Sequence, residues 1–195
     1  MQVEWYGQSA FPPIEGVEAE LLLVTHEHAD HNGVEAIAGS PTVLRGSAGR
    51  LQSPIGEVLA VASERDAAAG TERGSNTIFA FVLDRVRIAH LGDFGQRELR
   101  GDQGNAIGPV DLLFVPVGGG PTIDADQAAA IVDRSRPRWI VPMHYRTPTI
   151  GFLETAEPFL ARMPHVQTLQ SSSFELGEHE NVEREIPLVI VPAVP

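Results

Sequence analysis

The chain has 195 residues, with 14 basic and 26 acidic side chains and a formal net charge of −12 at pH 7. This length suits one well-buried domain, so we expect a single domain over residues 1–195. The acidic balance argues against a nucleic acid or an anionic membrane surface as the main partner. Because the chain contains no Cys, a disulfide framework, a thiolate metal ligand and a thiol nucleophile are excluded.

Short apolar runs bounded by Gly, Pro, Asp or Ser recur along the chain and predict β-strands. The predicted strands cover residues 3–6, 19–25, 41–44, 58–62, 77–83, 86–91, 110–117, 139–143 and 188–191. The two-residue turn Asp84-Arg85 predicts an antiparallel hairpin between the fifth and sixth of them.

Fewer segments have the spacing of a helix. The clearest is 124–135, where Ala128, Ile131 and Val132 form an apolar face and Pro137 follows the end. Weaker helical patterns cover residues 32–37 and 154–163. Because strands and helices interleave, we expect an α/β layered domain. The N-terminal segment has no basic stretch before an apolar core, and no apolar run is long enough to span a bilayer, so we expect a cytoplasmic protein.

The run His26-Glu27-His28-Ala29-Asp30-His31 directly follows the predicted strand 19–25. Alternate residues of an extended chain point the same way, so His26 and His28 can converge on one ion. After the turn, Asp30 and His31 can address a second position nearby. We interpret this run, which holds three of the seven His of the chain, as a metal site in preference to a polar loop that is His-rich by chance.

Further candidates follow other predicted strands, where loops at a rigid edge can converge. Asp93 lies in a Gly-Asp-Phe-Gly turn after the second hairpin strand, and His144 ends the strand that follows the clearest helix. The glycine run 118–120 offers bare backbone N–H groups at the same edge. His90, three residues before Asp93, is interpreted as a supporting residue in preference to a ligand.

The order His-x-His-x-Asp-His, Gly-Asp and strand-terminal His resembles the metallo-β-lactamase superfamily. More narrowly, segments 73–77, 90–93, 116–119 and 142–145 resemble small zinc-dependent hydrolases related to ascorbate-phosphate lactonases. The resemblance implies an αββα sandwich with its site at one edge of the two sheets. It also implies hydrolysis of an ester, lactone or phosphoester bond in a small-molecule substrate, and it leaves the oligomeric state open.

The resemblance also implies roles for single residues. His26 and His28 would bind a first metal ion, and Asp30, His31 and His144 a second, with Asp93 between the two. Asp30 would also orient the attacking water or accept its proton. Such ligands suit Zn, and also Mn or Fe.

One expected ligand of the first ion is missing. Relatives have Ser-x-His-Asp where this chain reads Ser63-Glu64-Arg65-Asp66, and Arg keeps its proton and cannot coordinate a cation. Three explanations stay open. Arg65 supplies the positive charge in a one-metal enzyme, or Glu64 or Asp66 restores the missing ligand, or the site is degenerate and the fold serves binding or assembly.

Overall fold

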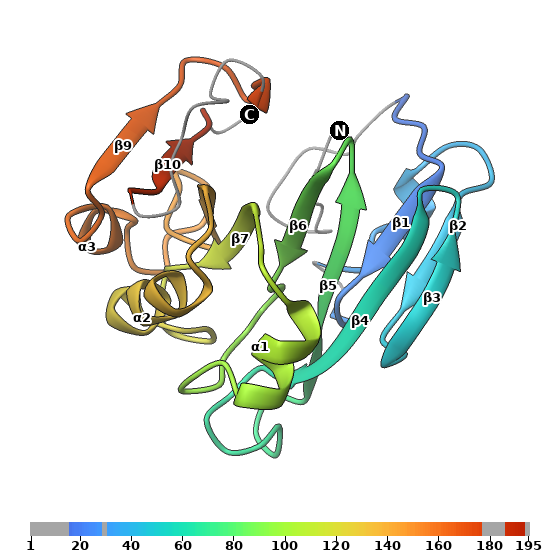
Figure 1. Cartoon of the computed structure of the whole chain (residues 1–195), viewed down its shortest axis with the longest axis horizontal. Helices are drawn as coiled ribbons and strands as arrows, with labels where there is room; N and C mark the ends of the chain where they lie inside the picture. The colour runs from blue at the N-terminus through green and yellow to red at the C-terminus, as the bar shows by residue number, and fades with distance from the viewer. Residues whose placement is uncertain (1–15, 29–30, 177–185, 194–195) are drawn as a thin grey trace.

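The computed structural model describes residues 16–28, 31–176 and 186–193. The predicted strand at residues 3–6 and the candidate ligand Asp30 lie outside these ranges. The described strands form two sheets (Figure 1). The smaller sheet pairs β1 (Leu21–Val24) with β2 (Thr42–Arg45) in parallel.

The larger sheet has eight strands in the order β3-β4-β5-β6-β7-β8-β10-β9. They are β3 (Gly49–Ser53), β4 (Gly56–Glu64), β5 (Ser75–Leu83), β6 (Val86–His90), β7 (Leu112–Pro116), β8 (Trp139–Met143), β9 (His165–Thr168) and β10 (Leu188–Val191). Neighbouring strands from β3 to β6 pair antiparallel. The pairs β6–β7, β7–β8, β8–β10 and β10–β9 are parallel. Consequently β4, β6, β7 and β8 all run in one direction, and their carboxyl ends meet at one edge.

The hairpin between β5 and β6 confirms the turn predicted from the sequence. Asp84 and Arg85 both have left-handed backbones, with φ of 49° and 66°. Two such residues make a turn whose twist matches that of the flanking strands.

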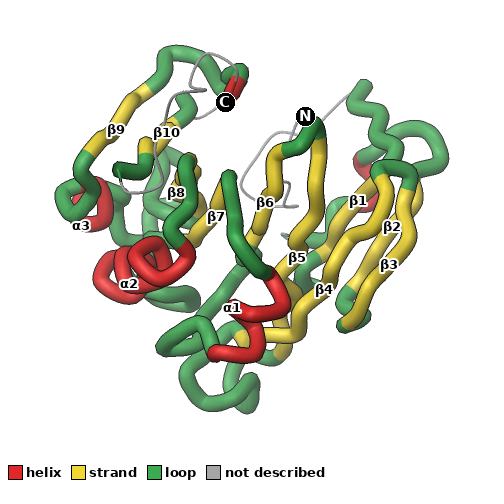
Figure 2. Tube along the Cα trace, in the orientation of Figure 1, coloured by secondary structure: helices red, strands yellow, loops and turns green. Residues whose placement is uncertain are grey.

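Helices and the smaller sheet cover opposite faces of the larger sheet (Figure 2). Along β5, Ile78 and Ala80 face the core that includes Ile107 of α1 (Gly101–Ile107), Ile131 of α2 (Ala125–Ser135) and Phe159 of α3 (Glu157–Leu160). Phe79 and Phe81 face the other core, against which Leu21, Leu23 and Leu44 of the smaller sheet pack. The predicted α/β sandwich is confirmed.

Helix α2 begins with a reciprocal capping arrangement. The Asp124 carboxylate accepts a hydrogen bond from the Gln127 backbone N–H at 2.9 Å, and the Gln127 side chain accepts one from the Asp124 N–H at 3.1 Å. The helix ends at Arg136, whose backbone is left-handed. The predicted helix 124–135 is therefore confirmed. The predicted helix at 32–37 is one 3₁₀ turn, Val34–Ala36, and the one at 154–163 is reduced to α3.

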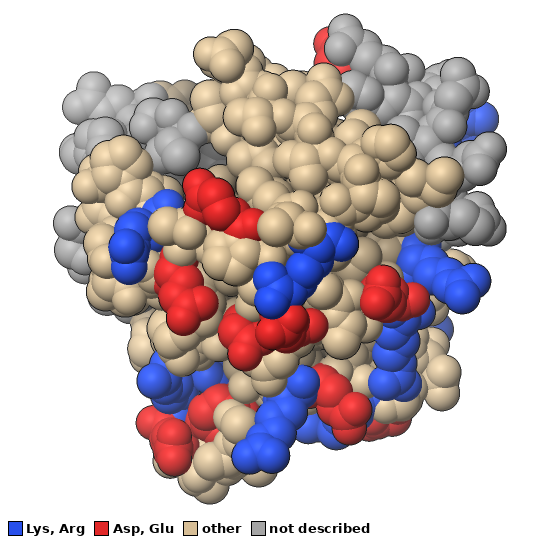
Figure 3. All heavy atoms as spheres, turned by 90° about the vertical axis from the view of Figure 1, so that its left-hand side faces the viewer, with Lys and Arg blue, Asp and Glu red and all other residues tan. Residues whose placement is uncertain are grey.

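The surface carries charges of both signs. On the face shown in Figure 3, acidic and basic side chains lie interspersed and do not gather by sign. In the described part of the chain, none of the helices combines the length and apolarity needed to cross a membrane.

Candidate metal centre

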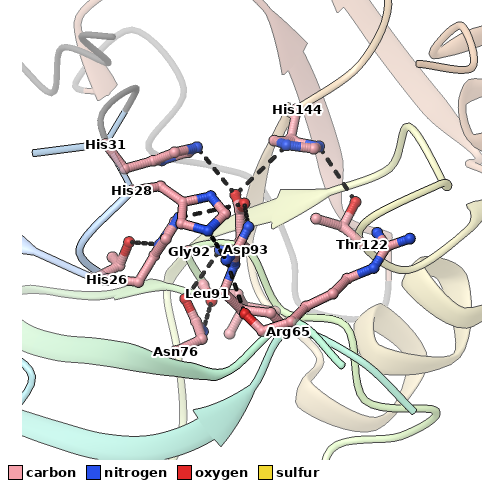
Figure 4. Close-up of polar contacts among 12 residues, drawn as sticks. His26, His28, His31, Arg65, Asn76, Leu91, Gly92, Asp93, Thr122 and His144 are labelled. Carbon is pink, nitrogen blue, oxygen red and sulfur yellow. Dashed lines mark hydrogen bonds and ion pairs between the residues drawn. The ribbon is translucent and has the colours of Figure 1, made fainter. Parts of the chain in front are cut away.

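Four strands bring the candidate residues to one edge of the sandwich. His26, His28 and His31 follow β1, Arg65 follows β4, and Asp93 follows β6. His144 follows β8. Figure 4 shows these side chains converging on Asp93. Asp30, expected among them, lies outside the described residues.

Asp93 lies at the centre of the cluster and is 3% exposed. Its Oδ1 atom lies 3.5 Å from His31 Nε2 and 3.6 Å from His144 Nε2. Its Oδ2 atom lies 3.5 Å from His26 Nε2 and 3.3 Å from Nη2 of Arg65. Each carboxylate oxygen therefore faces a different part of the cluster.

The three imidazole distances fit shared coordination of a cation better than hydrogen bonding. They exceed the usual limit for an N–H···O hydrogen bond, about 3.2 Å. Two N or O ligands of one tetrahedral Zn²⁺, each bonded at about 2.0–2.2 Å, lie about 3.4 Å apart. One atom each of His26, His31 and Asp93 lies within 4.8 Å of the others. This donor set of imidazole nitrogen and carboxylate oxygen thus fits a divalent metal ion.

His26 is held in the neutral form that coordinates metals. Burial lowers its pKa to about 3, and the opposing attraction of Asp93 does not offset this loss of hydration. Among the described residues, no hydrogen-bond partner meets His26 Nε2, whereas Nδ1 lies 2.9 Å from the Thr25 hydroxyl. A neutral His26 with its proton on Nδ1 has its Nε2 lone pair available to a cation placed beside Asp93 Oδ2.

Asp93 stays ionised. Burial would raise its pKa, but electrostatic interactions with the surrounding basic side chains outweigh burial and lower the pKa below its ordinary value. In decreasing order, these contributions come from His144, His31, His26 and Arg65. A buried carboxylate in such surroundings supplies the negative charge that a cation requires.

Asn76 fixes the backbone that carries Asp93. Its Oδ1 accepts the Asp93 N–H at 3.0 Å, and its Nδ2 donates to the Leu91 carbonyl at 2.8 Å. Gly92, between them, has a φ of +60°, and a Cβ there would lie 2.4 Å from Asn76 Oδ1. The sequence prediction did not assign a role to Asn76, although it lies in segment 73–77, which carried part of the resemblance.

His144 has a strained backbone and a polar support. Its φ is +52°, which is rare for a residue other than Gly and is typical of functional sites. Gly118 permits this arrangement, because a Cβ there would lie 2.1 Å from the His144 carbonyl oxygen. The Thr122 hydroxyl donates to the Gly119 carbonyl at 3.2 Å and lies 3.3 Å from His144 Nδ1. When the one hydroxyl proton goes to the Gly119 carbonyl, Oγ1 accepts from Nδ1–H, and the Nε2 lone pair of His144 then faces Asp93.

His90 lies beside the cluster and packs on Phe114, with ring centroids 5.5 Å apart. Its Nδ1 accepts the Gly92 N–H at 3.1 Å. Burial, with a smaller contribution from the nearby His31, lowers its pKa to about 4 against the attraction of Asp93. These contacts match the supporting role expected for His90.

Arg65 joins His28 to Asp93. Its Nη1 donates to His28 Nε2 at 2.8 Å and to the Arg73 carbonyl at 3.0 Å, while Nη2 donates to Asp93 Oδ2 at 3.3 Å. His28, predicted to bind the first ion beside His26, therefore has its Nε2 atom engaged by a guanidinium.

The acidic neighbours of Arg65 are engaged elsewhere. Glu64 accepts a hydrogen bond of 2.6 Å from Arg100. Both carboxylate oxygens of Asp66 accept backbone N–H groups of its own loop. The four donors are Ala68, Gly70, Glu72 and Arg73, at 2.7 to 3.2 Å. Neither carboxylate is positioned to replace the missing ligand, which weakens the second of the three explanations.

A family model described as the Beta-lactamase superfamily domain matches residues 2–144. The chain belongs to the metallo-β-lactamase superfamily. Within this superfamily it is similar to a UPF0173 protein of Pyrococcus abyssi, 29% identical over 186 residues that cover 75% of this chain and 84% of the relative. It is also 30% identical to a UPF0173 metal-dependent hydrolase of Thermococcus onnurineus, over 68% of this chain and 70% of the relative.

Solved structures of other proteins share the fold. A protein of Thermotoga maritima, described as a proposed Zn-dependent hydrolase, superposes with a TM-score of 0.76 at 27% identity and covers 94% of this chain and 87% of its own. A protein of Parabacteroides distasonis, at 17% identity, superposes with a TM-score of 0.57 over 90% of this chain and 77% of its own. The second likeness concerns the fold alone.

Proposed function

We propose that this chain is a metal-dependent hydrolase that attacks an ester, lactone or phosphoester bond of a small molecule with metal-activated water. The observation that carries the proposal is the buried convergence of three imidazole Nε2 atoms on the Asp93 carboxylate, at 3.5 to 3.6 Å. The names of the Thermococcus and Thermotoga relatives support metal-dependent hydrolysis.

His31, Asp93 and His144 hold the ion in this proposal, with His26 facing the other carboxylate oxygen. Asp30, which follows His28, is assigned by resemblance as a further ligand and as the acceptor of the water proton. We propose Zn, because the spacing of the donor atoms fits its tetrahedral coordination, and Mn and Fe suit the same ligands.

A divalent ion bound here supplies an acidified water at neutral pH and polarises the bond to be broken. The residues of the chain prepare this chemistry. Asp93 keeps its negative charge, His26 stays neutral, and Thr122 turns the Nε2 lone pair of His144 toward Asp93. Because these groups are buried and oriented before substrate arrives, little reorganisation is needed on binding.

Purified protein, loaded with Zn²⁺ and assayed on a panel of esters, lactones and phosphoesters, tests the proposal. We expect a bound transition metal and hydrolysis of at least one class, both lost in EDTA and restored by metal. Asp93→Ala removes the central ligand, so kcat/KM should fall by more than the ~100-fold that loss of an outer partner costs.

The matched control is Asp133→Ala, which removes an exposed carboxylate from α2 and should change neither metal content nor rate. A parent protein that binds no transition metal would sink the proposal. Metal bound without turnover of any substrate class would favour the degenerate binding protein.

A further inference from the structure

We propose that this centre takes one metal ion per chain, because the guanidinium of Arg65 permanently occupies the first of the two metal positions implied by the family. The inference rests on the proposed metal site. It makes His28 a partner of Arg65 instead of a metal ligand.

The ligand atoms of the first position already have a cation between them. That position would use His26, His28 and the Oδ2 atom of Asp93. Nη1 of Arg65 lies 2.8 Å from His28 Nε2, and Nη2 lies 3.3 Å from Asp93 Oδ2. A guanidinium has no acceptor atom, so His28 Nε2 must accept, and its lone pair is used. The residues present therefore do not fit a first metal ion.

Burial and backbone hydrogen bonds fix the position of Arg65. It is 5% exposed, its backbone N–H donates to the Gly74 carbonyl at 3.1 Å, and its side chain donates to the Arg73 carbonyl. Gly95 packs on its peptide group, because a Cβ there would lie 2.2 Å from the Arg65 carbonyl oxygen. Asp66 closes the following loop through four backbone hydrogen bonds. The backbone that carries the guanidinium is thus held from both sides.

On the opposite side of Asp93, two imidazole nitrogens face Oδ1 among the described residues. Oδ1 lies 3.5 Å from His31 Nε2 and 3.6 Å from His144 Nε2. The charge of Arg65 repels a second cation placed within a few ångströms of it, and it balances part of the carboxylate charge as that ion would. One ion and one guanidinium therefore share the two oxygens of Asp93.

Metal content per chain, measured by elemental analysis after saturation with Zn²⁺ and removal of free ion, tests the inference without an activity assay. We expect one ion in the parent protein and one in His28→Ala. His31→Ala should bind the ion at least 100-fold more weakly, since it removes a ligand of the occupied position. Two ions in the parent, or loss of the ion in His28→Ala, would overturn the inference.

Arg65→His tests the cause. It removes the guanidinium and supplies an imidazole, so we expect two ions per chain, while Arg97→His, which adds an exposed imidazole elsewhere, keeps one. One ion in a folded Arg65→His variant would refute the role of Arg65. If this variant fails to fold, the comparison of His28→Ala with His31→Ala still decides the matter.

NMR of ¹⁵N-labelled His side chains gives a second readout in the unaltered protein. On addition of Zn²⁺, the ring nitrogens of His31 and His144 should shift, and His28 Nε2 should keep the shift of a hydrogen-bonded acceptor. A metal-bound shift at His28 Nε2 would contradict the inference. A parent protein that binds no ion would instead defeat the proposed function, so the two failures are distinguishable.

Discussion

A single hydroxyl decides which nitrogen of His144 faces the centre. Thr122 Oγ1 lies 3.3 Å from His144 Nδ1, and with its proton donated to the Gly119 carbonyl it accepts from Nδ1–H. Such outer partners orient metal-ligating imidazoles and raise their basicity. The sequence alone did not indicate Thr122, because it lies 22 residues before His144 and no local pattern links the two.

We expect Thr122→Val to weaken metal affinity by about 10-fold to 100-fold, because it removes the acceptor for Nδ1–H and leaves the shape nearly unchanged. Thr122→Ser keeps the hydroxyl and should restore most of the affinity. Competition titration against a metal chelator measures both variants. Equal affinities in the Val and Ser variants would show that the hydroxyl does not support His144.

At the level of single side chains, the sequence predicted which residues gather but not all of their partners. His26, His31, Asp93 and His144 could be placed together because each follows a predicted strand at one edge. The engagement of His28 by Arg65 could not, because whether a long guanidinium side chain turns inward depends on loop packing between distant segments.

The ends of β7 and β8 lie in direct backbone contact at the centre. Gly118 follows β7, and a Cβ on it would lie 2.1 Å from the His144 carbonyl oxygen and 2.7 Å from Tyr145 Cα. Backbone atoms cannot swing aside as a flexible side chain can. Gly118, in the glycine run at this edge, therefore leaves room for the backbone of His144.

Gly118→Ala should force these two segments apart, lower the free energy of unfolding by about 1–3 kcal/mol and weaken metal binding. Gly151→Ala is the matched control, because nothing lies within 4 Å of a Cβ there. Urea unfolding and metal titration of both variants check the prediction. Unchanged metal affinity in Gly118→Ala would mean that His144 tolerates displacement.

Elements with strong local patterns were predicted, and elements formed by tertiary contacts were not. The boundaries predicted for β8 and β10 agree with the structure. Helix α1 was missed because Gly101 and Gly104 are poor helix formers. Its burial comes from Ile107 and from Gln103, whose side chain donates to the Ala62 carbonyl at 2.8 Å. Strands β3 and β9 were missed because each is short and mostly polar, with one large apolar residue, Leu51 in β3 and Val166 in β9.

At the scale of the whole molecule, two buried histidines make the metal-free fold sensitive to acid. Burial lowers the pKa of His26 to about 3 and that of His90 to about 4, from 6.5. Below pH 6.5 the unfolded chain binds protons that the folded chain excludes, so the free energy of unfolding falls as pH falls. The cost is absent above pH 6.5 and grows as pH falls toward the folded pKa values.

Urea unfolding in EDTA between about pH 7 and pH 5 should show this decline, with each titrating histidine adding a slope of up to about 1.4 kcal/mol per pH unit. His90→Phe should reduce the slope, whereas His165→Ala, at an exposed position in β9, should leave it unchanged. A flat profile would show that these imidazoles gain protons without unfolding.

The extent of the domain over residues 1–195 stays a prediction.

The division of the strands into two sheets gives the centre a mechanical consequence. His26 and His31 follow the smaller sheet, while Asp93 and His144 follow strands of the larger one. The Thr77 N–H of β5 donates to the Thr25 carbonyl at 2.9 Å, so the sheets already touch beside the cluster. An ion held by ligands from both would act as a cross-link between the layers. Its loss would leave β1 and β2 held on the larger sheet by the apolar packing of Leu21, Leu23 and Leu44 and by the Thr77–Thr25 hydrogen bond. The stability of the sandwich would therefore depend on the supply of metal.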